Sequence, residues 1–484
     1  MSQAARDLLH RHFGFNAFRG SQEAVIDHLL AGGHALVVMP TGQGKSLCYQ
    51  APALALPGLT LVVSPLIALM KDQTDALRSR GIDAVTINSS LGADQRRERL
   101  QALREGRHRL LYVSPERFRK AEFAAVLARR SVSLLAVDEA HCISEWGHDF
   151  RPDYSRLGEF SRQVGGPLTV ALTATATPRV QEDIVAQLEL PPASVRLFHD
   201  GVERPNLRLA VEAVHGTQEK AERLAALLRG ARGSAIVYFA LIRSLEEMSL
   251  LLERSGLPHL VYHGRLPRDQ RQRVQEAFMA DPAARVLATN AFGLGVDKAA
   301  IGLIAHAEAP GSLEAYVQEI GRAGRDGLPA HCVLLYDQQD LLIQMEFVEW
   351  ANPAPGFLER LLAHLRDRAA EVRAGGLDFL RAELVFHGRF DFRLETALNL
   401  LERHGLITGD LERGRLDLLA ERLPPQLEDE ERAAEKKRRD LSRLHDLVRY
   451  INTPECRHGF LHEFFGATAG PPCAVCDRCR ESSP

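Results

Sequence analysis

The stretch Pro40-Thr41-Gly42-Gln43-Gly44-Lys45-Ser46 decides the fold of this chain, because it places a glycine-containing turn between a strand and a helix. The apolar run Ala35–Val38 before it is typical of a short buried parallel strand, and Leu47–Ala55 after it begins a helix. The two glycines let successive backbone N–H groups and the helix N-terminus face one anion. The lysine adds a positive charge, and the serine hydroxyl adds a ligand for Mg²⁺. The pattern therefore predicts a loop that binds the phosphates of a nucleotide.

Apolar segments alternate with charged, helix-forming segments on both sides of a boundary near Gly233. Strands are expected before it at Leu59–Val63, Ala84–Ile87, Leu110–Val113, Leu134–Val137 and Thr169–Leu172. After it, strands are expected at Ser234–Phe239, Leu260–Tyr262, Val286–Thr289 and Leu303–His306, with helices at Leu245–Ser255 and Gln270–Ala280. Such alternation predicts an α/β fold with two parallel sheets covered by helices.

The bulk composition is that of a globular protein with several cores. A chain of 484 residues is too long for one core, so three or four domains are expected. No apolar run approaches the roughly 18 residues that a membrane span needs, and the mixed segment Met1–Phe13 predicts no signal peptide. We expect a cytoplasmic protein that does not contact a membrane. Because the net charge is −3, nucleic acid would have to bind to local basic patches.

Two adjacent acids open the run Asp138-Glu139-Ala140-His141, directly after the strand expected at Leu134–Val137. They could simply cap the next helix. Ligands, however, gather at the carboxyl ends of parallel strands. Together with the phosphate loop the acids gain a chemical role: Asp138 holds Mg²⁺ with Ser46, and Glu139 polarises the water that attacks the γ-phosphate.

An aromatic turn with a following helix, Gln22–Leu30, precedes the phosphate loop. By itself it is a packing segment. Placed just before a phosphate loop, an aromatic ring, an arginine and an amide can sandwich a base and bond to its edge. We therefore interpret the segment Phe13–Gln22 as an adenine pocket.

The segment Cys142–Tyr154 places aromatic residues among glycine, proline and arginine, which is typical of a loop. Exposed aromatic rings beside an ATPase site are costly unless they stack on something, and unpaired bases offer such faces. Nearby, Thr173–Thr177 suits a hinge or coupling segment. Ser64–Met70 and Ser114–Arg117 either hold nucleic-acid phosphates or simply start helices.

Two basic residues close the second block. Arg322 and Arg325 lie three positions apart, one helical turn, so both can point the same way. They are either solvated or act as arginine fingers from a second lobe, since the phosphate loop carries no arginine of its own.

Four of the seven cysteines form a C-terminal cluster with the spacing C-x16-C-x2-C-x2-C. Cys456, Cys473, Cys476 and Cys479 are enough to close a tetrahedral zinc site. The other three lie far apart in sequence, so we predict no disulfide framework.

The ordered motifs resemble those of superfamily 2 helicases, and within them of the RecQ family. The resemblance runs from Phe13 to about Asp337 and rests on FRGSQ, TGQGKS, VVSPLIALMKDQ, LYVSPERF, DEAH, ISEWGHDFRPDY, TATAT, ATNAFGLGVDK and QEIGRAGRDG. Met39 stands where the full phosphate-loop pattern has glycine, which fits the looser form of nucleic-acid motor ATPases.

The resemblance implies two RecA-like lobes with ATP in the cleft and 3′ to 5′ translocation on single-stranded DNA. By motif position, Phe15, Arg19 and Gln22 hold adenine, and Arg322 with Arg325 closes on the γ-phosphate. The residues implied to couple DNA to hydrolysis are His141, Trp146, Phe150 and Arg151.

One segment departs from the family pattern. About 80 residues separate the second lobe from the zinc module, whereas the family places a winged helix after that module. Helices expected at Phe357–Ala374, Leu377–Phe386 and Phe392–His404, followed by a hairpin-like pair, predict a winged-helix pattern. Its role is strand contact, protein docking or mere spacing, and the chain ends four residues after Arg480.

The predicted domains are a first lobe at 1–207, a second lobe at 208–345, a winged-helix-like domain at 346–422 and a helical zinc-binding module at 423–484. The last begins with a long helix, Asp429–Tyr450, whose basic run Lys436–Arg439 is a solvated face or a DNA contact.

These observations predict a monomeric ATP-dependent DNA helicase that uses ATP, Mg²⁺ and Zn²⁺ in repair or recombination. Its expected partners are single-stranded DNA, forked or tailed duplexes and a single-stranded-DNA-binding protein, and its expected place is the cytoplasm, at the nucleoid. The alternatives are a DNA-stimulated ATPase that translocates or anneals without separating strands, and a scaffold that uses ATP as a switch.

Overall fold

The computed structural model describes residues 3–88, 91–147, 149–151, 153–202, 204–293, 296–384, 391–410, 415–468 and 470–481. The chain divides into two compact units. One comprises Met1–Pro310, Glu314–Tyr336 and Tyr450–Pro484, and the other comprises Gly311–Leu313 and Asp337–Arg449. The predicted division at 207, 345 and 422 stays a prediction.

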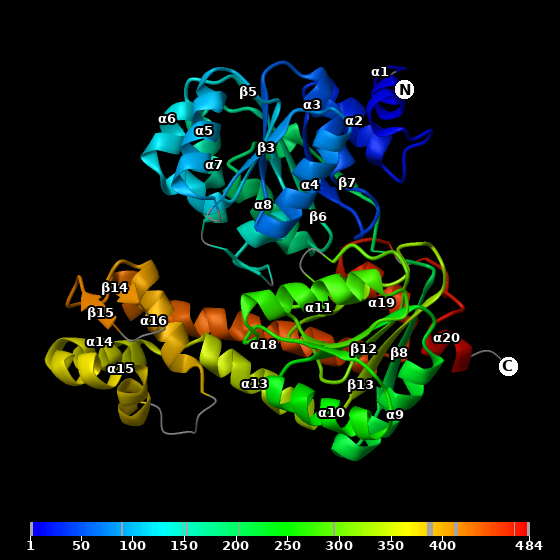
Figure 1. Ribbon diagram of the computed structural model, residues 1–484, viewed down its shortest axis with the longest axis vertical. Coiled ribbons are helices and arrows are strands. Elements are labelled where there is room, and N and C mark those ends of the chain that lie inside the picture. The colour runs from blue at the N-terminus through cyan, green and yellow to red at the C-terminus, as the bar shows by residue number, and fades with distance from the viewer. Residues whose placement is uncertain are drawn as a thin grey trace. The chain divides into compact units, whose positions relative to one another are not determined.

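The first sheet of the first unit is a seven-stranded parallel sheet in the order β3-β4-β2-β5-β6-β1-β7 (Figure 1). Its strands are β1 His34–Val38, β2 Leu59–Val63, β3 Ala84–Ile87, β4 Leu110–Val113, β5 Val132–Val137, β6 Leu168–Thr173 and β7 Val195–His199. The α-helices of this part are α1 Gln3–Leu8, α2 Gln22–Leu30, α3 Leu47–Ala55, α4 Ile67–Ser79, α5 Ala93–Arg104, α6 Ala121–Leu127, α7 Leu157–Gln163 and α8 Pro178–Gln187.

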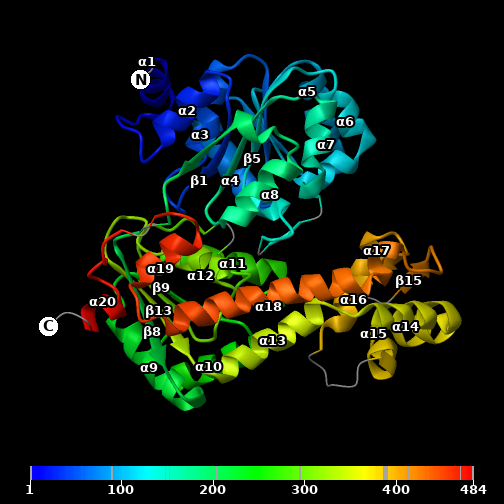
Figure 2. The ribbon, with the colours of Figure 1, turned by 180° about the vertical axis from the view of Figure 1, so that it is seen from behind.

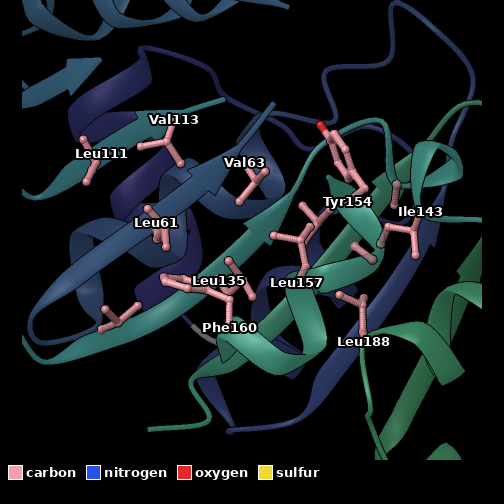
Figure 3. Close-up of a cluster of buried hydrophobic side chains, with 14 of the residues drawn as sticks. Leu61, Val63, Leu111, Val113, Leu135, Ile143, Tyr154, Leu157, Phe160 and Leu188 are labelled. Carbon is pink, nitrogen blue, oxygen red and sulfur yellow. The ribbon is translucent and has the colours of Figure 1, made fainter. Parts of the chain in front are cut away.

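Both faces of this sheet are buried, because successive strand residues point to opposite sides. Leu61 and Val63 join a cluster with α5, α6, α7 and α8, whereas their neighbour Val62 joins a cluster with α1 to α4. Figure 3 shows the first cluster, in which Leu135 and Phe160 also take part. This explains why the strands read as continuous apolar runs in the sequence.

The second sheet is a six-stranded parallel sheet in the order β10-β11-β9-β12-β13-β8. Its strands are β8 Leu207–Ala213, β9 Ser234–Phe239, β10 Leu260–Tyr262, β11 Arg285–Thr289, β12 Ile301–His306 and β13 Ala330–Tyr336. The helices of this part are α9 Gly216–Gly230, α10 Ile242–Arg254, α11 Arg268–Ala280 and α12 Leu313–Ile320. The predicted α/β fold with two parallel sheets is therefore confirmed.

Two short C-terminal helices complete the first unit, α19 Arg457–Phe464 and α20 Asp477–Glu481. Figure 2 shows them beside β8 of the second sheet. Asp477 Oδ2 accepts a hydrogen bond from the backbone N–H of Val211 at 3.0 Å, and His458 Nε2 lies 3.0 Å from the carbonyl oxygen of Leu207. The cysteine-bearing segment is thus anchored on the second sheet.

The second unit is helical, with one small hairpin. Its elements are α13 Gln339–Ala351, α14 Pro355–Asp367, α15 Ala369–Leu384, α16 Arg393–Arg403, β14 Ile407–Asp410, β15 Arg415–Leu418, α17 Pro425–Glu428 and α18 Glu430–Asn452. Leucines of α14, α15 and α16 form one core. The predicted hairpin is confirmed, since β14 pairs antiparallel with β15.

Several sequence expectations in this unit need correction. The single helix expected at Phe357–Ala374 is wrong, because Arg368 has φ −122° and ψ 33° and separates α14 from α15. The end of the helix expected at Leu377–Phe386 and the turn of the hairpin, with Glu412 and Arg413, lie outside the described residues. Three strands, β7, β8 and β13, were not predicted.

A membrane-spanning helix is not found: within the described ranges, no helix is both long and apolar enough to cross a bilayer.

We predict that Leu135→Ala lowers the free energy of unfolding of the first lobe by about 2 to 5 kcal/mol, because Leu135 is fully buried and a cavity would remain. Urea unfolding followed by tryptophan fluorescence measures this. The control is Leu250→Ala, which removes a side chain that is 56 % exposed and should change stability by less than about 0.5 kcal/mol. Equal effects of the two substitutions would contradict the assignment of the core.

Candidate nucleotide site, coupling loop and metal centre

The phosphate loop lies at the carboxyl edge of the first sheet, next to the two acids. Val38 of β1 is in register with Thr173 of β6, and Val137 of β5 is in register with Ala171 of β6. Because these three strands are parallel neighbours, the residues that follow β1, β5 and β6 meet at one edge. Gly42 and Gly44 have φ of 87° and 80°, the left-handed region that the predicted turn requires.

Lys45 is held in this edge. Its Nζ donates a hydrogen bond to the carbonyl oxygen of Met39 at 3.1 Å. Burial lowers the pKa of Lys45, and the negative charges of Glu139 and then Asp138 oppose that shift. The structure thus brings the predicted lysine and both predicted acids within electrostatic reach of one another.

The two acids differ in environment. Burial raises the pKa of Asp138 to about 7; the charge of Glu139 acts in the same direction, and that of Lys45 acts against it. Glu139 has φ 48° and ψ 49°, a left-handed conformation that costs energy for a residue other than glycine. Its buried Oε2 accepts no hydrogen bond from the described residues. An unsatisfied carboxylate oxygen in a strained backbone is typical of a functional position.

The donor set fits a hard divalent cation. Asp138 supplies a carboxylate, and Ser46 a hydroxyl at the start of α3, which are oxygen ligands of the kind that Mg²⁺ takes beside nucleotide phosphates. When bound, Mg²⁺ would neutralise charge on the phosphates. A cation there would also compensate the proximity of Asp138 to Glu139.

His141 connects the acids to the segment after β6. It lies in the short helix Ala140–Ile143, where its Nδ1 is 3.0 Å from Thr173 Oγ1 and 3.4 Å from Glu139 Oε2. Thr173 Oγ1 also donates to the carbonyl oxygen of Thr175 at 3.1 Å. One buried chain of polar contacts therefore joins Glu139 to the predicted coupling segment Thr173–Thr177.

Two of the three residues predicted to hold adenine, Arg19 and Gln22, lie beside the phosphate loop. Gln22 is buried, and its Nε2 donates to the carbonyl oxygens of Gln43 at 2.7 Å and Gly44 at 3.1 Å, while its Oε1 accepts from the N–H of Arg19. The amide of Gln22 thus fixes the phosphate loop directly. Phe15 is 50 % exposed. A hollow beside the loop is lined by Arg19, Gly20, Gln43 and Asp200.

The aromatic residues of the predicted coupling loop are less exposed than expected. Tyr154 is fully buried, and its hydroxyl donates to the carbonyl oxygen of Asp138 at 3.3 Å. Trp146 and Phe150 are half-buried, and the guanidinium of Arg179 covers the Trp146 ring. The expectation of exposed rings is therefore wrong, because the loop folds back on the core of the first lobe.

Arg151 belongs to the same loop and contacts two other residues of it. Its guanidinium pairs with Asp149 at 2.9 Å, and its N–H donates to the carbonyl oxygen of Cys142. Burial lowers the pKa of Arg151, but the hydrogen bond and charge of Asp149 outweigh it, so the net shift is upward. His148 and Pro152 lie outside the described residues.

Arg322 and Arg325 do not share a helical face, which corrects the sequence expectation. Helix α12 ends at Ile320, and Gly324 has φ 55°, so both arginines lie in a turn. Arg322 is buried and donates to the carbonyl oxygen of Gly293. Arg325 donates to Asp297 Oδ1 at 2.6 Å. The adjoining residues Leu294 and Gly295 of the motif ATNAFGLGVDK are not described.

Arg325 is the arginine of this turn that approaches the phosphate loop. Its Cγ lies 3.3 Å from the place where a Cβ on Gly42 would stand, and its positive charge contributes to lowering the pKa of Lys45. Burial lowers the pKa of Arg325 itself, and Asp297 opposes that shift.

Arg204 is a residue of this region that sequence reasoning missed. Its guanidinium donates to the carbonyl oxygens of Thr41, Gly321, Ala323 and Gly324. A lone arginine before a proline in a connecting segment carries no pattern that distinguishes it from a solvated one, so the sequence offered no signal.

The four predicted cysteines come together. In the part of the chain that is described, the Sγ atoms of Cys456, Cys473, Cys476 and Cys479 lie within 4.8 Å of one another. Cys473 Sγ and Cys479 Sγ are 3.9 Å apart, and tetrahedral Zn–S bonds of about 2.3 Å require about 3.8 Å. The backbone N–H of Cys473 points at Cys456 Sγ, and that of Cys476 at Cys473 Sγ, which stabilises thiolates. The donor set therefore fits Zn²⁺.

A buried ion pair braces this cluster. Arg457 follows Cys456 in sequence and is fully buried, and Asp477 follows Cys476. Arg457 Nε lies 2.6 Å from Asp477 Oδ1. The pair ties the two halves of the cluster together, independently of any metal.

Comparison with known proteins agrees with this geometry. Residues 19–184 match the DEAD/DEAH box helicase family, residues 211–327 the helicase conserved C-terminal domain, and residues 420–480 the RecQ zinc-binding family. The chain is 41 % identical over 350 residues to the probable ATP-dependent DNA helicase RecS of Bacillus subtilis, covering 71 % of this chain and 70 % of that protein. The chain belongs to the RecQ family of superfamily 2 helicases. It is also 43 % identical to the ATP-dependent DNA helicase RecQ of Bacillus subtilis, over 72 % of this chain and 59 % of that protein.

This RecQ-family chain spans little more than half the length of some relatives, since it covers 53 % of the RecQ helicase of Pasteurella multocida at 43 % identity. Among solved structures, the helicase Lhr of Mycobacterium smegmatis bound to ssDNA and AMP-PNP matches with a TM-score of 0.55 and 23 % identity, over 88 % of this chain and 61 % of that chain. Dbp5 of S. cerevisiae bound to RNA and ADP BeF3 matches with a TM-score of 0.56 and 16 % identity, over 71 % of this chain and 90 % of that chain. These likenesses support the fold of the two lobes alone.

We predict that the RecQ-family cysteine cluster binds one Zn²⁺ per chain, and that Cys476→Ser removes it. Elemental analysis of protein purified under reducing conditions measures the stoichiometry, and proteolysis of the C-terminal segment measures its stability. Structural zinc contributes about 10 to 16 kcal/mol of apparent binding energy, so the variant should be cleaved much faster.

The matched control is Cys332→Ser, a fully buried cysteine of β13 that lies outside the cluster and should leave the zinc content unchanged. A wild-type protein without zinc, or a Cys476→Ser variant with full stoichiometry, would contradict the assignment.

Proposed function

We propose that this chain is an ATP-dependent DNA helicase that moves 3′ to 5′ on single-stranded DNA and unwinds duplexes during repair or recombination. The observation that carries the proposal is the meeting of Lys45, Asp138 and Glu139 at one sheet edge. It is supported by the identity of 41 to 43 % to proteins named ATP-dependent DNA helicases.

Hydrolysis would use residues in separate roles. Thr41, Gly42, Gln43 and Gly44 present backbone N–H groups to the phosphates, and Lys45 balances their charge. Ser46 and Asp138 would hold Mg²⁺. Glu139, whose Oε2 accepts no hydrogen bond from the described residues, is placed to orient the attacking water. Arg325 would stabilise the charge that develops on the γ-phosphate, while buried Arg322 supports the turn.

Coupling to DNA would run through the loop after the acids. The contact of His141 with Thr173 joins Glu139 to the segment after β6, and the backbone of Arg151 is bonded to Cys142. A strand that displaces this loop would therefore move residues next to Glu139. Trp146 and Phe150 are half-buried, so stacking on bases would require the loop to shift outward.

The family resemblance supports the polarity and a role as a monomer, with tailed or forked duplexes and a single-stranded-DNA-binding protein as partners. The scaffold alternative is disfavoured by the identity of 41 to 43 % to proteins named ATP-dependent DNA helicases.

A second candidate is a DNA-stimulated translocase or annealing factor without strong strand separation. It is favoured by the second unit, where Arg393 is paired with Asp391 and Arg381 with Glu395. In the basic run, Lys436 bonds to Asn352 and Lys437 to Glu349. These pairs leave less positive charge for DNA.

The deciding experiment compares unwinding of forked, 3′-tailed and 5′-tailed duplexes, with ATP hydrolysis measured on the same samples. Unwinding of forked and 3′-tailed duplexes alone supports the helicase. Strong DNA-stimulated hydrolysis without unwinding of any duplex supports the translocase. Equal unwinding of 5′-tailed duplexes would contradict the polarity.

We predict that Lys45→Ala reduces ATP hydrolysis to background while the fold is retained, because it removes a phosphate-facing charge and little core volume. Steady-state hydrolysis with saturating single-stranded DNA measures the loss, and circular dichroism checks the fold. Lys120→Ala removes an exposed lysine of the same lobe and should keep wild-type hydrolysis. Retained DNA-stimulated hydrolysis in Lys45→Ala would rule out this site.

We predict that Arg151→Ala binds ATP normally but loses most of the stimulation of hydrolysis by single-stranded DNA. The side chain contacts Asp149 and the carbonyl oxygen of Pro65, so its removal alters the loop rather than the phosphate site. Hydrolysis with and without DNA gives the stimulation ratio. Arg156→Ala, which breaks an exposed pair with Glu159, is the control and should keep that ratio. A full ratio in Arg151→Ala would remove the loop from the coupling path.

A further inference from the structure

We propose that Arg204 is a positioning residue that holds the arginine turn, residues Gly321–Arg325, against the phosphate loop. The inference rests on the proposed hydrolysis of ATP, and it adds a residue from the segment between the two sheets to that site. Arg204 touches no reacting atom; it acts through Arg325.

The guanidinium of Arg204 bonds both to the phosphate loop and to the arginine turn. Its Nη1 donates to the carbonyl oxygen of Thr41 in the phosphate loop at 3.1 Å and to that of Gly321 at 3.2 Å. Its Nη2 donates to the carbonyl oxygens of Ala323 at 2.7 Å and Gly324 at 2.8 Å. A planar, permanently charged fork is suited to four acceptors at once, whereas the single ammonium of lysine is not.

Asn206 strengthens the hold on the same turn. Its Nδ2 donates to the carbonyl oxygens of Gly324 at 2.8 Å and Leu328 at 2.9 Å. The carbonyl oxygen of Arg204 accepts from the N–H of Leu207 at 2.8 Å, which fixes the backbone of the segment as β8 begins. Arg204 and Asn206 therefore secure the arginine turn from one side.

The other side of the turn carries the arginine that faces the site. Arg325 approaches Gly42, and its charge reaches Lys45. Because Arg204 bonds to Thr41 and Gly324, which adjoin Gly42 and Arg325 in sequence, it sets how closely Arg325 can approach the phosphates. Loss of Arg204 would leave Arg325 intact but let the turn move.

Water cannot easily replace this guanidinium. Arg204 borders a cavity lined largely by apolar side chains, including Val202, Leu209, Ile320 and Leu461. The interior of the cavity is about 20 Å³, room for about one water molecule. Burial lowers the pKa of Arg204, as expected for a charge in such surroundings. In a site of low dielectric the four carbonyl oxygens depend strongly on their donor.

The test compares Arg204→Ala and Arg204→Lys with a matched arginine. Arg109 also donates to three carbonyl oxygens, those of Ala53, Leu54 and Leu56, but far in sequence from the arginine turn. Arg109→Ala therefore controls for the loss of an arginine that clamps backbone carbonyls. Readouts are kcat and KM for ATP with saturating single-stranded DNA, affinity for a fluorescent ATP analogue with Mg²⁺, and hydrogen exchange of 320–328 without nucleotide.

We expect Arg204→Ala to lower kcat by about 10²-fold, since misplacement of a catalytic group by about 1 Å costs that much. The affinity for the ATP analogue should change by less than about threefold, because Arg204 does not contact the nucleotide. Arg204→Lys should recover part of the rate. Hydrogen exchange of 320–328 should rise in Arg204→Ala and stay at the wild-type level in Arg109→Ala, which should also keep kcat.

A double-mutant cycle separates positioning from general stability. If Arg204 acts through Arg325, adding Arg204→Ala to Arg325→Ala should lower kcat by less than about threefold more. Multiplicative losses, or an Arg204→Ala variant with wild-type kcat, would overturn the inference. If the wild-type protein hydrolyses no ATP, the proposed function fails. Independently of that outcome, hydrogen exchange of 320–328 that stays at the wild-type level in Arg204→Ala would overturn the role of Arg204. Should Arg204→Ala not fold, the same measurements on Arg204→Lys decide.

Discussion

The parallel pairing of β1, β6 and β5 is the constraint on which the rest of the site depends. Their register brings the ends of the three strands to one edge, so that Lys45, Thr173 and Asp138 follow from three neighbouring strands. A slip of one residue in any strand would turn its apolar side chains to the wrong face and would carry its functional residue out of the site. The alternating burial that sorts Val62 from Leu61 and Val63 therefore secures both the core and the chemistry. Stability and function here share one geometric origin.

The carboxyl edge of the first sheet brings charged side chains of both signs together. The edge holds one lysine against two acids. Burial raises the pKa of Asp138 to about 7; the charge of Glu139 acts in the same direction, and the charge of Lys45 acts against it. The same edge has a left-handed backbone at Glu139 and a buried oxygen, Glu139 Oε2, that accepts no hydrogen bond from the described residues. Each of these features is unfavourable in isolation and becomes useful when a cation and a polyphosphate bind. Binding of the cation and the polyphosphate would then offset part of the free energy that these features cost in the folded protein.

Much of the fold could be predicted from local patterns of apolar residues in the sequence. The strands expected at Leu59–Val63, Ala84–Ile87 and Ser234–Phe239 coincide with β2, β3 and β9, because strands buried on both faces leave continuous apolar runs. β7 and β8 leave no such run: β7 contains the exposed Leu197, and β8 includes the charged residues Arg208 and Glu212, so both escaped prediction. The four cysteines were found because metal ligands impose a spacing. Arg204 was missed because its four acceptors are backbone carbonyls brought together from distant segments, which leave no trace in a linear pattern. The break between α14 and α15 escaped for a similar reason, since Arg368 is neither glycine nor proline.

The hydrogen bond from strand β8 to the carboxylate of Asp477 affects how readily the protein aggregates. β8 is the outermost strand of the second sheet, and Asp477 Oδ2 accepts the backbone N–H of Val211 in that strand. An exposed strand edge is a template for pairing with another chain, and natural proteins cover such edges. Here the cover is the segment that carries the cysteines. Oxidation or demetallation of that segment would therefore expose the edge of β8 to other chains, and the first visible sign of damage would be precipitation of the protein.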